Sequence, residues 1–228
     1  MSNAERNTVN ALGQLKKSQF VTIHYPENKG LKVMFVGNSI TLHGILPEIG
    51  WERECGMAAS SIENDYVHIT ERAVLTDHPD ASFCICQVAE WERNYKNGTE
   101  SHALFEDARD FDADIIIMRM SENCPRDDYD DDLFYKAYGE LLDYLNKSGK
   151  AKIVITNPFW PYPTDDAIRR FAENNGYPLV LLNDLGEDDS MMAKGEYWHE
   201  GVQVHPGDRG MQNIANRIIK CMKENKYI

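Results

Sequence analysis

Short apolar segments alternate with longer amphipathic segments along most of this chain. The short segments are continuous apolar runs of strand length, and they occupy residues 32–36, 82–88, 114–120, 152–156 and 178–182. Apolar residues at helical spacing lie between and after these runs, around residues 64–73, 99–111, 133–145, 164–175 and 206–222. This alternation predicts βαβ units, and therefore a three-layer α/β/α sandwich with a parallel sheet of about five strands.

The length of the chain suits one domain. Its 228 residues are enough for a sizeable core, and no linker or internal repeat divides them. We expect residues 31–228 to form that domain. Residues 1–30 are polar and weakly patterned, and we expect them to form an irregular leader that packs on the edge of the domain.

The charge and the cysteines restrict the partners and the compartment. The formal net charge is −13, which repels polyanions, so neither nucleic acid nor an anionic membrane is an expected partner. No apolar run is long enough to span a bilayer, and no secretory signal is visible. The five cysteines are irregularly spaced, which favours free thiols. These features predict a cytoplasmic protein and leave its oligomeric state open.

The first predicted strand ends in the turn Gly37-Asn38-Ser39. Glycine permits a sharp turn, and a serine placed there stands at the carboxyl end of its strand, where open α/β sheets bind ligands. If a helix follows, its first amide groups lie close to the serine hydroxyl and can receive negative charge. Most Gly-x-Ser turns are only turns, so the candidacy of Ser39 as a nucleophile depends on residues further along the chain.

Four short motifs resemble, in order, the sequence blocks of the SGNH hydrolases, also called GDSL esterases and lipases. Residues 37–41 (GNSIT) are similar to the first block, whose usual form is Gly-Asp-Ser, and Gly56 is placed like the glycine of the second. Residues 121–123 (SEN) are similar to the third block, Gly-x-Asn-Asp, and residues 204–206 (VHP) to the fifth. The resemblance covers residues 33–222 and implies the flavodoxin-like parallel sheet of the SGNH hydrolase fold.

This resemblance implies a carboxylic ester hydrolase with a serine nucleophile. Ser39 would attack the ester carbonyl, and His205 would act as the general base. The backbone amides of Ser39 and Gly56, with the side-chain amide of Asn123, would form the oxyanion hole. Serine ester hydrolysis needs neither a metal ion nor an organic cofactor, so no cofactor is predicted.

Three positions in the third and fifth blocks depart from the family's pattern. Ser121 stands where the third block usually has glycine, and Cys124 stands where it usually has aspartate. The family's acid lies three residues before the histidine, and that position is Val202 in this chain. Glu200 is the candidate triad acid if two extra residues bulge before His205. Alternatively, Asp208 orients the imidazole, or a backbone carbonyl does so and the enzyme works as a dyad.

Two other groups of polar residues favour structural roles. The aspartates between 127 and 132 precede a helical pattern, and we expect a helix cap because the spacing and the glycine of a calcium loop are missing. His199, Glu200 and His205 lack the spacing of a helical zinc motif. The sequence therefore predicts no metal site.

Aromatic residues follow several predicted strands. Trp91 and Trp160, together with His43 after the serine turn, are predicted to bind substrate, because flat aromatic faces suit both sugars and acyl chains. The expected substrate is a short acyl ester, with an O-acetyl group on a carbohydrate as the favoured form. Two alternatives remain open: a catalytically silent domain that binds a glycan or other small ligand, and a flavodoxin-like nucleotide binder. The second is disfavoured because the first turn lacks a Gly-x-Gly-x-x-Gly run.

Overall fold

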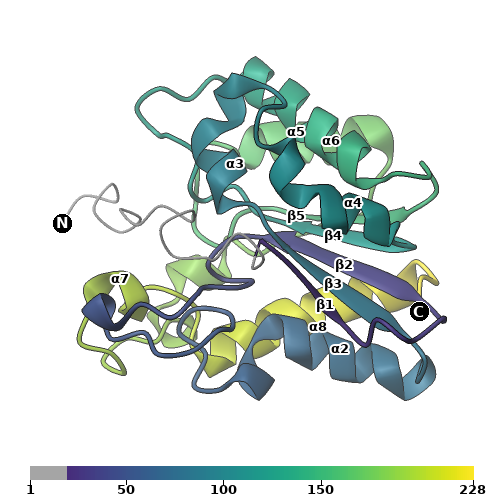
Figure 1. Ribbon diagram of the computed structural model, residues 1–228. Helices are drawn as coiled ribbons and strands as arrows, with labels where there is room; N and C mark the ends of the chain where they lie inside the picture. The colour runs from purple at the N-terminus through teal and green to yellow at the C-terminus, as the bar shows by residue number, and fades with distance from the viewer. Residues whose placement is uncertain (1–19) are drawn as a thin grey trace.

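The computed structural model describes residues 20–228 and has a six-stranded sheet between two layers of helices (Figure 1). The strands are β1 Val21–His24, β2 Lys32–Gly37, β3 Ser82–Gln87, β4 Ile115–Arg119, β5 Lys152–Thr156 and β6 Leu179–Val180. Their order is β1-β3-β2-β4-β5-β6, with five parallel strands and β1 antiparallel to β3. The three-layer α/β/α sandwich predicted from the sequence is therefore confirmed.

Strand β2 lies at the centre of the sheet and pairs with β3 on one side and with β4 on the other. The chain leaves β2 to form β3, and then crosses to the opposite side to form β4. The carboxyl end of β2 is thus the point where the strand order reverses, and ligand sites of open α/β sheets form at this point. Ser39 lies two residues beyond the end of β2.

Helices cover both faces of the sheet (Figure 1). The helix α2 Tyr66–Asp77 and the helix α8 Asp208–Glu224 pack side by side on one face. The other face carries α3 Ala89–Asn94, α4 Glu106–Phe111, α5 Asp131–Leu145 and α6 Asp165–Asn175. The short helix α7 Glu200–Gln203 lies beyond the carboxyl ends of the strands, close to the loop that follows β2. None of the helices in residues 20–228 combines the length and the apolar character needed to cross a bilayer.

The amphipathic helices form for the reasons that the sequence indicates. In α8 the apolar residues at 3.6-residue spacing are buried against the sheet, among them Met211, Ile214 and Ile218. At the start of α5, the Asp130 side chain accepts a hydrogen bond from the Leu133 amide at 2.9 Å. The aspartate cluster is thus a helix cap, as predicted.

The structure differs from the sequence-based prediction at three places. Residues 21–24, assigned to the irregular leader, form the edge strand β1 because their backbone pairs with β3; residues 1–19 lie outside the described part. The cap of α2 is Asp65, which accepts from the His68 amide at 2.8 Å, and not the serines or the asparagine just before it. Residues 99–111 divide into a 3₁₀ turn and α4.

Candidate active site

A tight turn after β2 presents Ser39. The Asn38 carbonyl accepts hydrogen bonds from the amides of Thr41 and Leu42, both at 2.9 Å. Gly37 is required at this turn by close approach: a Cβ there would collide with the Thr41 side chain and lie 2.7 Å from the Arg119 carbonyl oxygen. No helix follows immediately, so the expected helix amides are not the groups beside the hydroxyl.

The structure brings Ser39 and His205 together, although 166 positions separate them in the chain. The Oγ of Ser39 lies 2.9 Å from the Nε2 of His205. The Nδ1 of the same ring lies 2.7 Å from the carbonyl oxygen of Gly201. A carbonyl oxygen only accepts, so Nδ1 carries the hydrogen and Nε2 presents its lone pair to the serine hydroxyl. This is the tautomer that a general base requires.

The backbone carbonyl of Gly201 therefore orients the His205 ring. Helix α7 holds the Gly201 carbonyl in place, and its cap is His199, whose Nδ1 accepts from the Gly201 amide at 3.1 Å. The Glu200 side chain is exposed and does not occupy the Nδ1 position of His205. Asp208 is bonded elsewhere, to the hydroxyl of Ser60 at 2.6 Å. Of the alternatives in the sequence analysis, the geometry matches the backbone carbonyl.

Burial keeps His205 neutral. Its side chain is almost completely removed from water, and this burial, which the Gly201 hydrogen bond only partly offsets, lowers its pKa to about 3. The positive forms of His43 and Arg119 lower the pKa further. A histidine with so low a pKa stays unprotonated, and so able to accept a proton, over the whole neutral pH range.

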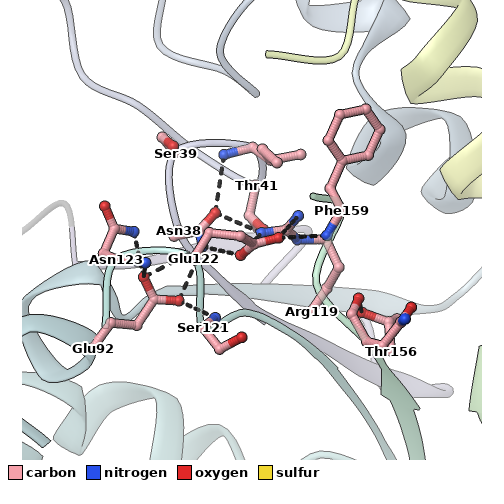
Figure 2. Close-up of polar contacts among 12 residues, drawn as sticks. Asn38, Ser39, Thr41, Glu92, Arg119, Ser121, Glu122, Asn123, Thr156 and Phe159 are labelled. Atoms are coloured by element: carbon pink, nitrogen blue, oxygen red, sulfur yellow. Dashed lines mark hydrogen bonds and ion pairs between the residues drawn. The ribbon is translucent and has the colours of Figure 1, made fainter. Parts of the chain in front are cut away.

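A buried polar network supports the Ser39 turn from beneath (Figure 2). The Arg119 guanidinium forms a two-pronged ion pair with Glu122, at 2.9 Å and 2.8 Å, and its Nη2 also donates to Asn38 Oδ1 at 2.6 Å. Asn38 Nδ2 in turn donates to both Glu92, at 2.9 Å, and Glu122, at 2.5 Å. The asparagine that replaces the family's usual aspartate therefore links a buried cation to two buried carboxylates.

Glu92 holds the third-block loop through one carboxylate group. It accepts hydrogen bonds from the backbone amides of Ser121 and Asn123 and from the Nδ2 of Asn123 (Figure 2). The Asn123 Oδ1 accepts from Arg93 at 3.4 Å, so both ends of this amide have a partner. Together these contacts fix which way the amide nitrogen of Asn123 points.

The carboxylates of Glu92 and Glu122 lie close to the Arg119 guanidinium in this buried space, and Arg119 pairs with Glu122. The unfavourable energy of burying a second negative charge therefore falls on Glu92. Burial, reinforced by the nearby Glu122 charge, raises the pKa of Glu92 to about 7, against the opposing effect of the amide donors. The ionised form is the one that can accept from all of its donors, while the protonated form has to release one of them.

For the ester hydrolysis that the sequence resemblance implies, this titration predicts a pH dependence. His205 stays neutral down to about pH 4, so the step in kcat/KM near pH 7 is expected to come from Glu92. As the pH falls through about 7, Glu92 takes up a proton and loosens Asn123, and kcat/KM should drop roughly tenfold, less than the loss of a whole oxyanion donor. Profiles of kcat/KM between about pH 4 and about pH 9 check this. Glu92→Gln should be flat near the low-pH level, and a step that survives in Glu92→Gln would contradict the assignment.

Of the three predicted oxyanion donors, two remain candidates. The Ser39 backbone amide has no acceptor among residues 20–228. Asn123 Nδ2 has a second hydrogen besides the one given to Glu92. Gly56 is different, because its single amide hydrogen is donated to Asp65 Oδ2 at 3.0 Å. Packing requires a glycine at position 56, since a Cβ there would lie 2.5 Å from the Ile40 carbonyl oxygen.

Ser121 occupies a backbone conformation that favours glycine. Its φ is +110°, which explains why the family's third block usually has glycine there. The Ser121 hydroxyl lies 2.7 Å from that of Thr164, and this hydrogen bond offsets part of the strain.

This conformation predicts an unusual order of stabilities. Both Ser121→Ala and Ser121→Gly lose the hydrogen bond to Thr164, but only glycine also relieves the positive φ. The glycine variant should therefore be more stable than the alanine variant by about 1–2 kcal/mol, measured by urea denaturation. At Ser82, a buried β3 position without positive φ, the usual order with alanine above glycine should hold. Equal stabilities of the two Ser121 variants would contradict this account.

The three predicted substrate-binding residues lie in different surroundings. Trp160 is half-buried. Its ring packs edge to face with the His205 imidazole, with 5.3 Å between the centroids and 87° between the ring planes, so it lies beside the base. His43 is buried, and its Nδ1 lies 2.6 Å from the Gly44 carbonyl oxygen. Trp91 requires a correction: it is fully buried in the core, against Tyr95 and Phe134, and does not line the site.

Three features of the site were missed by the sequence analysis: Glu92, Arg119, and Glu122 as an ion-pair partner. A backbone carbonyl was one of its alternatives for orienting His205, but Gly201 was not identified as its source. One signal was available, because a positive charge inside the apolar run of β4 requires a buried carboxylate nearby. Nothing in the sequence marks Glu92, which lies on a short helix without clear periodicity, or a backbone carbonyl.

Comparisons with known proteins agree with this geometry at the level of the fold. No protein-family model matches the chain, and no curated protein matches its sequence significantly. Its structure is similar to a psychrotrophic esterase from Pseudoalteromonas sp., with a TM-score of 0.57, 10% identity, and coverage of 86% of this chain and 99% of that one. It is also similar to a two-domain esterase active on acetylated mannans, with a TM-score of 0.56, 15% identity, and coverage of 91% of this chain and 58% of that one.

An acetyl xylan esterase is a third structural neighbour, with a TM-score of 0.53, 17% identity, and coverage of 83% of this chain and 98% of that one. These likenesses show that the chain has the SGNH hydrolase fold. The fold implied by the four sequence motifs is thereby confirmed.

Proposed function

From this fold and the Ser39–His205 pair, we propose that the protein is a serine ester hydrolase. The observation that carries the proposal is the 2.9 Å contact between Ser39 Oγ and His205 Nε2, with the opposite ring nitrogen held by a carbonyl. A serine hydroxyl is a weak nucleophile until a base in hydrogen-bond contact takes its proton. A Ser–His hydrogen bond with a purely structural role could lie anywhere in the fold. This half-exposed serine lies at the switch point of the sheet, where ligands bind.

The proposed reaction proceeds in two steps. Ser39 Oγ attacks the ester carbonyl carbon while its proton passes to His205 Nε2, and the carbonyl oxygen becomes an oxyanion. The amide of Ser39 and the second hydrogen of Asn123 Nδ2 stabilise that charge. The intermediate collapses when His205 returns the proton to the leaving alcohol. Water, activated by the same imidazole, then hydrolyses the acyl enzyme and restores Ser39.

The proposed substrate is a short acyl ester, with O-acetyl groups of a carbohydrate as the favoured class. Trp160 lies against the His205 ring at one side of the site. Trp198 is 68% exposed, lies three residues before Gly201 in the chain, and packs over Gly50. Exposed indole faces suit the C–H faces of sugar rings. Two structural neighbours are described as active on acetylated mannans and as an acetyl xylan esterase, and both descriptions support this class.

One observation favours a second candidate, a domain that binds a glycan without hydrolysing it. His205 Nδ1 meets a neutral carbonyl, which stabilises the imidazolium formed during the reaction less than a carboxylate would. We favour hydrolysis because the hydrogen bonds that a working base needs are already formed.

The test is labelling with an alkyl fluorophosphonate, followed by intact-mass analysis and peptide mapping. Such probes react with serines that a base and an oxyanion hole activate. A single adduct on Ser39 is expected, and unlabelled protein should release acetate from acetylated xylo- or manno-oligosaccharides. Absence of an adduct on protein shown to be folded would overturn the esterase and favour the silent domain. An adduct without acetate release would retain the esterase and reject the carbohydrate class.

A further inference from the structure

A second cluster of functional side chains lies outside the Ser39–His205 pair. His24 ends the edge strand β1, and His68 and Glu71 lie one turn apart on α2. One potential ligand atom from each of the three lies within 4.8 Å of the others. The His24 and His68 rings are 5.3 Å apart between centroids, and His24 Nδ1 lies 2.7 Å from Glu71 Oε1. Forty-four positions separate the two histidines in the chain, so the sequence does not reveal the cluster.

A buried carboxylate orients the second histidine. Asp65, fully buried, accepts through Oδ1 from both the backbone amide and the Nδ1 of His68, each at 2.8 Å. The hydrogen of the His68 ring is therefore on Nδ1, and Nε2 keeps its lone pair. Metal-binding histidines are usually held in this way, with a carboxylate on the nitrogen that does not bind the metal.

The burial of the cluster also suits an ion. The Glu71 side chain is only 5% exposed, so its charge needs a positive partner close by. The imidazoles are 25% exposed at His24 and 18% at His68, which leaves a path for an ion and for a bound water. Bonds of about 2.0–2.2 Å from two imidazole nitrogens and one carboxylate oxygen form three corners of a tetrahedral zinc site. The three ligand atoms lie within 4.8 Å of one another, so the half-exposed His24 ring has to shift for all three to reach one ion.

We propose that His24, His68 and Glu71 bind a divalent transition-metal ion of the zinc class, with water as the fourth ligand. Imidazole and carboxylate together select Zn²⁺ over Mg²⁺ or Ca²⁺, which prefer all-oxygen sites. The ion has a structural role. It ties the edge strand β1 to α2, and through Asp65 it braces Gly56, whose neighbour Met57 donates its amide to the Ser39 carbonyl at 2.8 Å.

The test measures binding without relying on hydrolysis. Tag-free protein is stripped with a chelator, dialysed and titrated with Zn²⁺ against a chromophoric chelator. One ion per chain is expected, and Zn²⁺ at about 100 times Kd should raise Tm by roughly 5–10 °C. His24→Gln, His68→Gln and Glu71→Gln should each weaken binding by at least ~10-fold, the lower bound for disturbing such a site. The matched control is His78→Gln, at the end of the same helix, which should bind like the wild type.

Cobalt distinguishes this cluster from the five buried cysteines. Co²⁺ bound to nitrogen and oxygen ligands shows visible d–d bands without the intense near-ultraviolet band of a thiolate complex. Absence of binding at millimolar Zn²⁺, a thiolate band, or unchanged affinity in the folded cluster variants would each overturn the proposal. His24→Gln keeps the test decisive if the helix variants fail to fold, because His24 is half-exposed at the end of an edge strand.

Discussion

Replacing Ser39 by alanine is expected to lower kcat/KM for a short acyl ester by on the order of 10⁴–10⁶, because the attacking oxygen is removed. Among residues 20–228 the hydroxyl makes one hydrogen bond, to His205, and the residue is half-buried, so the fold should be retained. The measurement is acetate release from an aryl acetate and from an acetylated oligosaccharide, with thermal melting as the check on folding. Fluorophosphonate labelling should disappear in the same variant.

The matched control is Ser148→Ala. Ser148 is exposed in the loop between α5 and β5, and its backbone amide, which the substitution keeps, donates to Asp112 at 3.1 Å. Its kcat/KM should equal that of the wild type. His205→Ala should lose about as much activity as Ser39→Ala, and the double variant should lose no more, because the two groups act as one unit. Near-normal hydrolysis by Ser39→Ala would show that another group is the nucleophile.

The arrangement of strands was predictable because the strands are buried on both faces. In β4 and β5 nearly every side chain packs against one of the two helix layers. The sequence therefore shows apolar runs there that can be recognised without knowing the neighbouring elements. The edge strand β1 was not predictable from such a run. Three of its four residues are half-exposed and Ile23 is exposed, and the strand is held by backbone pairing with β3, which leaves little trace in the sequence.

The candidate site was predictable as a set of positions but not as a set of contacts. Topology alone brings Ser39 and His205 to one edge of the sheet. The partner of His205 depends on the few residues of α7, which aim the Gly201 carbonyl at the ring. The sequence left open whether a carboxylate, such as that of Glu200, or a backbone carbonyl would take this place. Trp91 was misplaced for a related reason: an aromatic residue after a strand can turn into the core as readily as into the site.

The largest expected effect on stability follows from Arg119→Leu. This guanidinium is fully buried at the end of β4 and holds Glu122 by two hydrogen bonds and Asn38 by a third. Its removal leaves two buried carboxylates, Glu92 and Glu122, with no guanidinium between them. Breaking a buried ion pair in this way costs about 3–5 kcal/mol. For a chain of this size that corresponds to a fall in Tm of roughly 6–20 °C.

Two further variants separate the loss of charge balance from the loss of a side chain. Arg170→Leu removes an exposed arginine that pairs with Asp131 at 2.8 Å, and it should cost at most about 1 kcal/mol. The double variant Arg119→Leu/Glu122→Leu removes both members of the buried pair, and it should recover much of the lost stability, because apolar replacement of a whole buried pair is often neutral. If the double variant were less stable than Arg119→Leu alone, the hydrogen bonds of Glu122 to Phe159 and Asn38, rather than its charge, would be the stabilising contribution. Urea denaturation of the four proteins at one pH therefore decides whether the network beneath Ser39 is held by charge or by hydrogen-bond geometry.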